Sequence, residues 1–330
     1  MTESQGCPKP AEHAAGGQAM QALRVGVMGA GHFGRFHALK LARMGLLAGV
    51  FDVSAERASL VAAECGSRAM AAERLIESSD AVAVAAPTAH HHALGLAVLR
   101  AGRHLLVEKP IAATLDQADE LIAEAAAGKL VLQVGHIERH SAAIIALRSA
   151  MGDFAPRSLE ATRVAPFRPR SLDTSVVLDL MIHDIDLVLS LVGAQLTGVR
   201  AVGGPVASSL PDYAVAQFTF ANGAQAQLTA SRVAFAMERK LRLLGPQGEI
   251  RVDFLERTLQ SLRPGHTNPA DHMPHHSRDT SSWTDHDSLE AELTAFTHAI
   301  TRNTNPEADG HIGRQALAAA LQVEEALRGG

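Results

Sequence analysis

The sequence predicts an α/β chain in two parts: a doubly wound parallel sheet comes first, and a mostly antiparallel sheet follows it. In the first part, short apolar runs alternate with helical patterns up to about residue 140. After about residue 150, several runs alternate polar and apolar residues, as half-buried strands do. The length of 330 residues is also long for one compact core, so two domains are expected.

Composition limits the partners that the chain can have. Hydrophobic residues make up 47% of the chain, charged residues 20%, and the formal net charge is −5. This balance suits a globular enzyme and gives no reason to expect nucleic acid or a membrane surface as a partner. No apolar run reaches ~18 residues, so no membrane insertion is expected. Cys7 and Cys65 are the only cysteines, which excludes a disulfide framework and predicts a cytoplasmic location.

Three segments follow from these patterns. Residues 1–21 lack a periodic apolar pattern and the apolar stretch of a secretory signal, so we expect a disordered extension, with Met20 as a second candidate start. Residues 22–140 should form the dinucleotide-binding domain. Residues 141–330 should form a second domain for substrate binding and subunit association, and its last helix could pack back on the first domain.

The first strand ends in a glycine-rich turn. The apolar run at residues 25–28 leads into the spacing Gly-x-Gly-x-x-Gly, and residues 35–42 then show helical periodicity. In such a turn the first glycine permits a tight bend, the second admits a pyrophosphate, and the third lets helix and strand pack closely. The residues expected to contact a dinucleotide here are Gly29, Ala30, Gly31, His32, Phe33 and Gly34.

Asp52 indicates which dinucleotide is bound. It ends the second short strand, residues 47–51, and comes 18 residues after Gly34. An acidic residue at this point can accept hydrogen bonds from an adenosine ribose, whereas its charge would repel a 2′-phosphate. No arginine follows Asp52 directly. The sequence therefore predicts a Rossmann domain that binds NAD rather than NADP.

The remaining elements of the first domain keep the alternating order. Ser54 is expected to cap a helix that runs to Cys65. The later strands and helices are expected at 81–86, 91–101, 105–107, 116–127 and 131–134. Parallel strands present their carboxyl ends at one edge of the sheet, where the ligand crevice lies. The residues expected to line the cofactor at the third and fourth strand ends are Pro87, Thr88, His91, Glu108 and Lys109, although His91 could instead cap the next helix.

The second half contains runs typical of antiparallel strands. Asn222-Gly223 between two alternating runs is a strong hairpin signal. One helix, at about 176–192, is expected to interrupt the sheet, and residues 263–287 are expected to form a mobile polar loop. Helices at 288–301 and 312–327 should close the chain. The strands are expected at 157–165, 196–203, 213–221, 224–232, 239–244 and 249–254.

Three residues are candidates for the chemistry. Lys109 ends a strand on the cofactor edge, where an ammonium group can stabilise a developing alkoxide. Asp179 and His183 are spaced i and i+4 in an otherwise apolar helix, which would place them on one face. A neighbouring carboxylate would raise the pKa of the imidazole and orient it as a general base. Asp186 is expected to be a structural partner, and the role of Asp184 is open.

Two other groups of residues have competing interpretations. Arg163, Arg168 and Arg170 surround Pro166 and Pro169, and they could form a solvated loop or hold a diphosphate. The histidines between residues 266 and 286 lack nearby cysteines and regular spacing, so no metal is expected there.

Several of these stretches resemble the glucose–fructose oxidoreductase, inositol dehydrogenase and MocA family. They are residues 29–34, Asp52, the segment 86–91, Glu108-Lys109-Pro110, Val134-Gly135-His136 and Asp179-x-x-x-His183. The resemblance implies that Lys109, Asp179 and His183 are catalytic. It also implies an open antiparallel sheet that joins subunits into a homodimer or homotetramer.

Longer stretches look like the branch of this family that acts on nucleotide sugars. They are residues 135–139, 165–170 and 176–186. This likeness implies NAD-dependent oxidation of a nucleotide sugar such as UDP-N-acetylglucosamine to a 3-keto sugar for lipid A synthesis. The residues expected to bind substrate are Lys109, Arg139, Arg168, Arg170, Asp179 and His183. The alternatives are a dehydrogenase of a free sugar or polyol such as myo-inositol, and a catalytically silent dinucleotide sensor.

Overall fold

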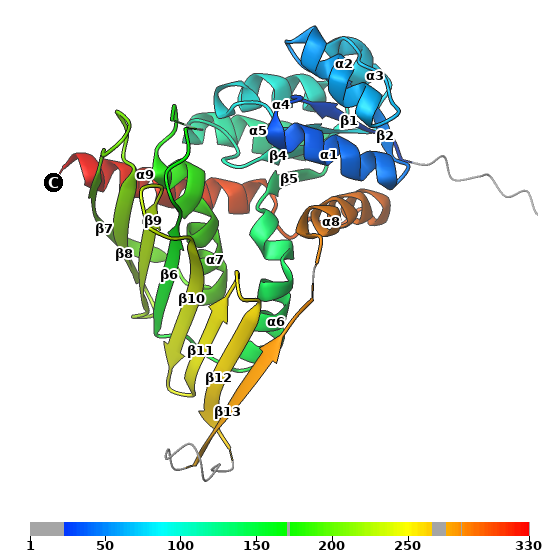
Figure 1. Ribbon diagram of the computed structural model, residues 1–330. Coiled ribbons are helices and arrows are strands. Elements are labelled where there is room, and N and C mark those ends of the chain that lie inside the picture. The colour runs from blue at the N-terminus through cyan, green and yellow to red at the C-terminus, as the bar shows by residue number, and fades with distance from the viewer. Residues whose placement is uncertain (1–22, 170–171, 266–274, 285, 330) are drawn as a thin grey trace, which may run out of the picture.

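The computed structural model describes residues 23–169, 172–265, 275–284 and 286–329. The expected N-terminal extension and Arg170 lie outside these ranges. The described chain forms two sheets connected by helices (Figure 1). The first sheet is entirely parallel and has the strand order β2-β1-β3-β4-β5, as predicted for a doubly wound domain. Its strands are β1 Val25–Met28, β2 Leu47–Phe51, β3 Ala81–Val84, β4 His104–Glu108 and β5 Leu132–Gly135.

Helices cover both faces of this parallel sheet (Figure 1). Ser54 and Thr114 act as N-caps because their side chains accept hydrogen bonds from the amides of Arg57 and Gln117. The short turn η1 spans Thr88–His90, and α3, which the sequence pattern did not predict, spans Ala72–Glu77. The other helices are α1 His32–Arg43, α2 Ala55–Glu64, α4 His91–Arg100 and α5 Leu115–Gly128.

The second sheet is mostly antiparallel, with the order β13-β12-β11-β10-β6-β9-β8-β7. Only β6 and β9 run parallel to each other in the described ladder. The hairpin at Asn222-Gly223 is confirmed, since Gly223 has a φ of +79° and joins two antiparallel strands. The strands are β6 Ser158–Val164, β7 Leu196–Gly204, β8 Tyr213–Phe220, β9 Gln225–Ser231, β10 Glu238–Gly245, β11 Gly248–Asp253, β12 Thr258–Pro264 and β13 His276–Ser282.

Strands β12 and β13 correct the prediction of a mobile loop at residues 263–287 in the described ranges, and residues 266–274 and 285 lie outside those ranges. Strand β12 extends to Pro264, and β13 pairs with it in antiparallel register from His276 to Ser282. Strand β13 is polar and mostly exposed, so it carries no apolar alternation. The segment is a strand because its backbone pairs with the backbone N–H and C=O groups along the open side of β12. A sequence pattern does not show that contact.

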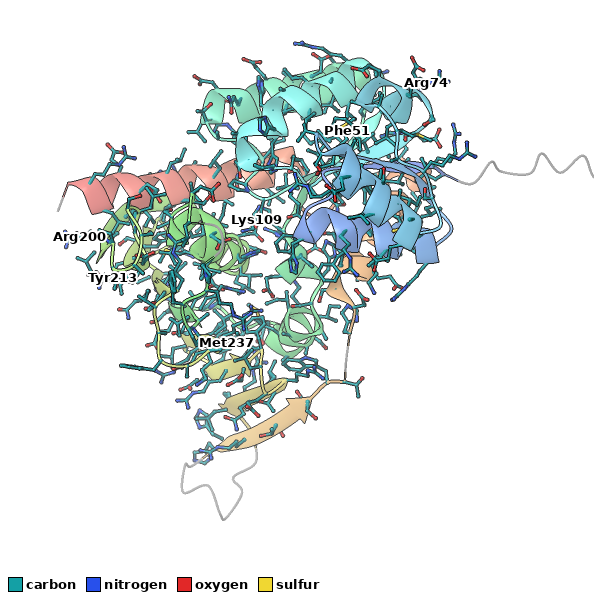
Figure 2. The ribbon with its side chains drawn as sticks, turned by 45° about the horizontal axis from the view of Figure 1, so that its top comes forward. Phe51, Arg74, Lys109, Arg200, Tyr213 and Met237 are labelled. Carbon is teal, nitrogen blue, oxygen red and sulfur yellow. The ribbon has the colours of Figure 1, made fainter. Side chains whose placement is uncertain are left out.

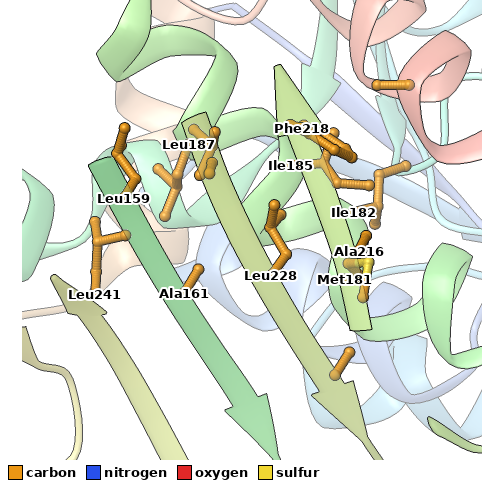
Figure 3. Packing of buried hydrophobic residues seen from close by; sticks show 14 of the residues in the cluster. Leu159, Ala161, Met181, Ile182, Ile185, Leu187, Ala216, Phe218, Leu228 and Leu241 are labelled. Carbon is orange, nitrogen blue, oxygen red and sulfur yellow. The ribbon is translucent and has the colours of Figure 1, made fainter. Parts of the chain in front are cut away.

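One face of the second sheet is buried. Strand β8 alternates along its length, and it points Phe218 and Phe220 inward. Helices α6 (Ala142–Met151) and α7 (Ile182–Val192) and the π-helical turn η3 (Val177–Met181) cover this face. Figure 3 shows Ile185 and Leu187 of α7 packed against Phe218 and its neighbours. Packing against the buried side of the sheet therefore holds η3 and α7 in place.

The last two helices connect the parts. Helix α8 (Ser288–Arg302) packs against α1, and its Leu293 and Phe296 join the core of the first sheet. Helix α9 (Gly310–Arg328) contacts both α5 and β5 of the first part and α7 and β7 of the second. No helix in the described ranges is both long enough and apolar enough to cross a membrane.

Candidate active site

The glycine-rich turn has the geometry that a pyrophosphate needs. Gly29 has a φ of +100°, and a Cβ there would lie 2.5 Å from the carbonyl oxygen of Ala85. A Cβ on Gly34 would lie 1.7 Å from the carbonyl oxygen of Gly29, so only glycine lets α1 pack on β1. A Cβ on Gly31 would meet nothing within 4 Å. The open space is therefore beside Gly31 at the N-terminus of α1, where anions bind.

His32 and Phe33 of the glycine-rich segment lie in the first helical turn of α1. The ring of His32 makes an edge-to-face contact with that of Phe36 at 4.9 Å, and Phe33 is 49% exposed. A contact of His32 and Phe33 with a dinucleotide stays a prediction, and their backbone amides are the groups suited to it.

Asp52 organises the same turn. Its carboxylate accepts hydrogen bonds from the amides of Ala30 at 2.7 Å and Ser54 at 2.8 Å. Burial acts to raise the pKa of Asp52, but these hydrogen bonds outweigh it and the pKa is lowered. Arg57 also reaches Asp52, at 3.1 Å, which the sequence did not indicate because Arg57 is one helical turn away from it.

The third strand is followed by Pro87 and Thr88, which lead through η1 into α4. His91 is buried there, and its two ring nitrogens lie 2.8 Å from the carbonyl oxygens of Ala86 and Pro110. Both nitrogens are thus engaged within the protein. The side chain of His91 ties the segments after β3 and β4 together, and it does not cap α4.

Lys109 follows the end of β4 and lies between the two sheets (Figure 2). Its Nζ donates a hydrogen bond to the backbone carbonyl of Asp179 at 2.6 Å and lies 3.6 Å from Asp179 Oδ1. Burial lowers the pKa of Lys109, and the negative charges of Asp179 and Glu108 act against that shift. Asp179 therefore holds the buried amine of Lys109 by two contacts.

His183 differs from the expectation. Its pKa lies well below the usual range, because burial and then the positive charges of Lys109 and Arg163 disfavour the imidazolium. The prediction that Asp179 raises this pKa is wrong. The turn η3 is wound as a π-helix with i→i+5 hydrogen bonds, so residues i and i+4 do not stack as in an α-helix. Asp179 instead faces Lys109, and His183 Nδ1 is buried with no partner among the described residues.

Two buried arginines support the helix that carries His183. Arg163 of β6 donates two hydrogen bonds to Asp184, at 2.9 and 3.0 Å, and a third to Glu138 at 2.7 Å. The two carboxylates raise the pKa of Arg163 against the effect of burial. Arg139 donates two hydrogen bonds of 2.7 Å to Asp186. The residues after His183 are therefore held from two sides.

Known enzymes are similar to this chain over most of its length. A UDP-N-acetylglucosamine 3-dehydrogenase of Acidithiobacillus ferrooxidans is 44% identical over 306 residues, which are 92% of this chain and 97% of that protein. A solved structure of that enzyme has a TM-score of 0.89 and covers 94% of this chain and 99% of its own. The chain belongs to the glucose–fructose oxidoreductase, inositol dehydrogenase and MocA family.

Two family descriptions agree with this membership. The description "Oxidoreductase family, NAD-binding Rossmann fold" matches residues 23–136, and "GFO/IDH/MocA C-terminal domain" matches residues 115–251. A myo-inositol 2-dehydrogenase of Thermotoga maritima is 25% identical over 92% of this chain and 96% of its own. The chain is therefore an oxidoreductase of this family, and its first part is the NAD-binding fold.

Family membership does not place every predicted substrate residue at the site. Arg139 is buried with its guanidinium bound to Asp186, so its geometry does not suit substrate contact. Asp186 is the structural partner that the sequence predicted. Arg163 is likewise held inside the protein, which excludes it as a free diphosphate anchor. Arg168 is exposed after β6, and Arg170 lies outside the described residues.

Sequence reasoning also missed the roles of three residues that shape this site in the oxidoreductase. Arg163 lies on the same face of β6 as the buried Leu159 and Ala161, so a charge on an apolar face was an available signal. His136 is buried, with neither ring nitrogen bonded to a described residue and Nδ1 3.8 Å from Asp186 Oδ2. Glu138 binds Arg163, a contact across 25 residues that no local pattern shows.

Proposed function

We propose that this oxidoreductase oxidises the C3 hydroxyl of UDP-N-acetylglucosamine to a 3-keto sugar with NAD. The observation that carries the proposal is the placement of Lys109 Nζ, 2.6 Å from the Asp179 carbonyl and close enough to His183 to lower its pKa. Lys109 follows β4 at the carboxyl edge of the parallel sheet, and the glycine-rich turn follows β1 at the same edge. The 44% identity to a UDP-N-acetylglucosamine 3-dehydrogenase supports the choice of substrate.

The site residues suit proton removal from an alcohol. A neutral His183 can accept the hydroxyl proton, and its lowered pKa keeps it neutral at neutral pH. The ammonium of Lys109 can stabilise the negative charge that develops on the same oxygen. Asp179 holds that ammonium in place. NAD, when bound, supplies the acceptor for the hydride from the carbon atom.

The nucleotide end of the substrate needs a separate anchor. Arg168 is exposed and follows β6, the strand whose Arg163 contributes its charge to the surroundings of Lys109. We assign Arg168, together with Arg170, to the diphosphate, because guanidinium groups bind phosphate oxygens in pairs. Remote binding of this kind positions the sugar for reaction.

A substrate panel tests the proposal. UDP-N-acetylglucosamine should give NADH, measured by absorbance, while free N-acetylglucosamine and myo-inositol should give little. Arg168→Ala should raise the KM for the UDP-sugar and leave the Kd for NAD unchanged. Arg74→Ala is the matched control, since Arg74 is an exposed arginine on α3 and lies away from Lys109 (Figure 2). Equal turnover of the free sugar would replace the nucleotide-sugar proposal with the sugar or polyol dehydrogenase.

We further propose a cytoplasmic homodimer or homotetramer that works in lipid A precursor synthesis. The cysteine content supports the compartment. The surface available for subunit association is the outer face of the second sheet, which lies opposite the face covered by α6, α7 and η3 and carries a hollow of about 670 Å³. Its lining includes Glu160, Arg200, Gln217 and Gln227. A 3-keto sugar is the form that transamination requires, which supports the metabolic role.

A further inference from the structure

A buried acidic pair lies behind Lys109, and the proposed reaction does not use it directly. Glu292 of α8 is fully buried, and neither of its carboxyl oxygens has a hydrogen-bond partner in the described ranges. One of these oxygens, an oxygen of Glu108 and a ring nitrogen of His37 all lie within 4.8 Å of one another. The three residues come from α8, β4 and α1, so the group forms only in the folded chain.

The surroundings of Glu292 disfavour a negative charge. Burial raises the pKa of Glu292 well above its usual value, and the charge of Glu108 raises it further. The nearest lysine of α1, Lys40, binds Asp287 and lies 3.8 Å from Glu290, both in the exposed start of α8. From η2 (Ile137–His140), which also packs on α8, Arg139 is bound to Asp186. No lysine or arginine in the described ranges therefore compensates a charge on Glu292.

Glu108 is the member of the pair that carries the charge. His37 Nε2 donates to its Oε1 at 2.7 Å. Burial acts to raise the pKa of Glu108, but this hydrogen bond and the charges of His37 and Lys109 lower it. Gly135 at the end of β5 leaves room for the Glu108 carboxylate, because a Cβ on Gly135 would lie 3.0 Å from Glu108 Oε2. An ionised Glu108 beside an unionised Glu292 is the stable combination, as in other close carboxyl pairs.

We propose that Glu292 is an uncharged carboxylic acid that lies beside the ionised Glu108, and that this pair positions the strand end carrying Lys109. Glu108 Oε2 also accepts from the amide of Lys109, at 3.3 Å. The Nε2 of Gln133 in β5 donates to the backbone carbonyl of Glu292 at 3.3 Å, which ties α8 to the same edge. Glu292 is thus a positioning residue. Its catalytic consequence depends on the proposed role of Lys109, whereas its protonation does not.

Thermal unfolding between pH 5 and 9 tests the protonation in the unliganded chain. The raised pKa means that wild-type stability should fall as the pH rises above about 4.3, where a glutamate in the unfolded chain ionises. Glu292→Gln keeps the shape and cannot ionise. Its Tm should therefore exceed that of the wild type at pH 8 by at least about 2 °C, and the two should converge towards acid pH. Glu290 lies in the first turn of the same helix, and the Tm of Glu290→Gln should follow that of the wild type at each pH.

Infrared spectroscopy gives a direct second measurement. The difference spectrum between wild type and Glu292→Gln at pH 8 should contain the C=O stretch of a protonated carboxylic acid. A carboxylate band in its place would overturn the proposal, as would a Glu292→Gln Tm below the wild-type value at pH 8. A stoichiometric divalent metal that is present in the wild type and lost in the variant would also overturn it, because His37, Glu108 and Glu292 would then be metal ligands.

Activity tests the positioning role. Glu292→Leu removes the carboxyl group beside Glu108 and should lower kcat several-fold while the KM for NAD stays nearly unchanged. It should also shift the pH profile of kcat, since a displaced Glu108 no longer acts on the pKa of Lys109. Glu292→Gln should restore both quantities. Equal kcat and pH profiles in all three proteins would refute positioning, and inactivity of the wild type towards UDP-N-acetylglucosamine would refute only the proposed function.

Discussion

Replacing the buried Arg163 by methionine should destabilise this oxidoreductase strongly. Arg163 is 4% exposed and satisfies Asp184 and Glu138 at once, so its loss leaves two carboxylates uncompensated inside the protein. Breaking a buried ion pair by removing one partner costs about 3–5 kcal/mol of unfolding free energy. The long methionine side chain retains most of the packing, so the loss of charge and hydrogen bonds should dominate.

The neighbouring strand offers a matched control. Arg242 of β10 also binds two carboxylates, those of Glu160 and Glu249, but its side chain is 35% exposed. Exposed ion pairs contribute about 0.2–1 kcal/mol, so Arg242→Met should cost several-fold less than Arg163→Met. Urea unfolding, followed by circular dichroism at equal protein concentration, measures both differences.

The effect of Arg163→Met should also depend on pH. Burial raises the pKa of Asp184, and Arg163 acts against that rise. Without Arg163 the folded chain holds a proton on Asp184 more tightly than the unfolded chain does, so the variant should lose stability as the pH rises above about 4. Equal costs for Arg163→Met and Arg242→Met, or a cost of Arg163→Met that is independent of pH, would refute the reasoning.

Three further predictions concern the site. Lys109→Met and His183→Ala should each lower kcat by roughly 10²–10⁴-fold with the Kd for NAD nearly unchanged. The acid limb of the wild-type pH profile of kcat should lie below the usual pKa range of histidine. Near-normal turnover in both variants would exclude the site. The protein should prefer NAD to NADP, and Asp52→Ala should reduce that preference, which kcat/KM for the two cofactors measures. Gly34→Ala should abolish NAD binding and lower Tm because of the clash with Gly29 O, whereas Gly31→Ala should keep its Tm and weaken NAD binding alone.

The sequence by itself determined the first sheet and its ligand edge. The spacing from Gly29 to Gly34, the strand that ends in Asp52 and the lysine after β4 depend on local bends and short elements, which adjacent residues specify. The alternating runs likewise indicated most strands of the second sheet, because one face is buried and the other is not.

Only the tertiary structure decided the charge states and several contacts. The π-helical turn directs Asp179 to Lys109, and burial among positive charges lowers the pKa of His183, so the spacing alone misled. Strand β13 exists because β12 pairs with it, although its own residues are polar. Glu292 lies 184 positions after Glu108, yet the two carboxyls meet behind Lys109. Burial and long-range pairing set these properties, and they arise only when distant segments pack together.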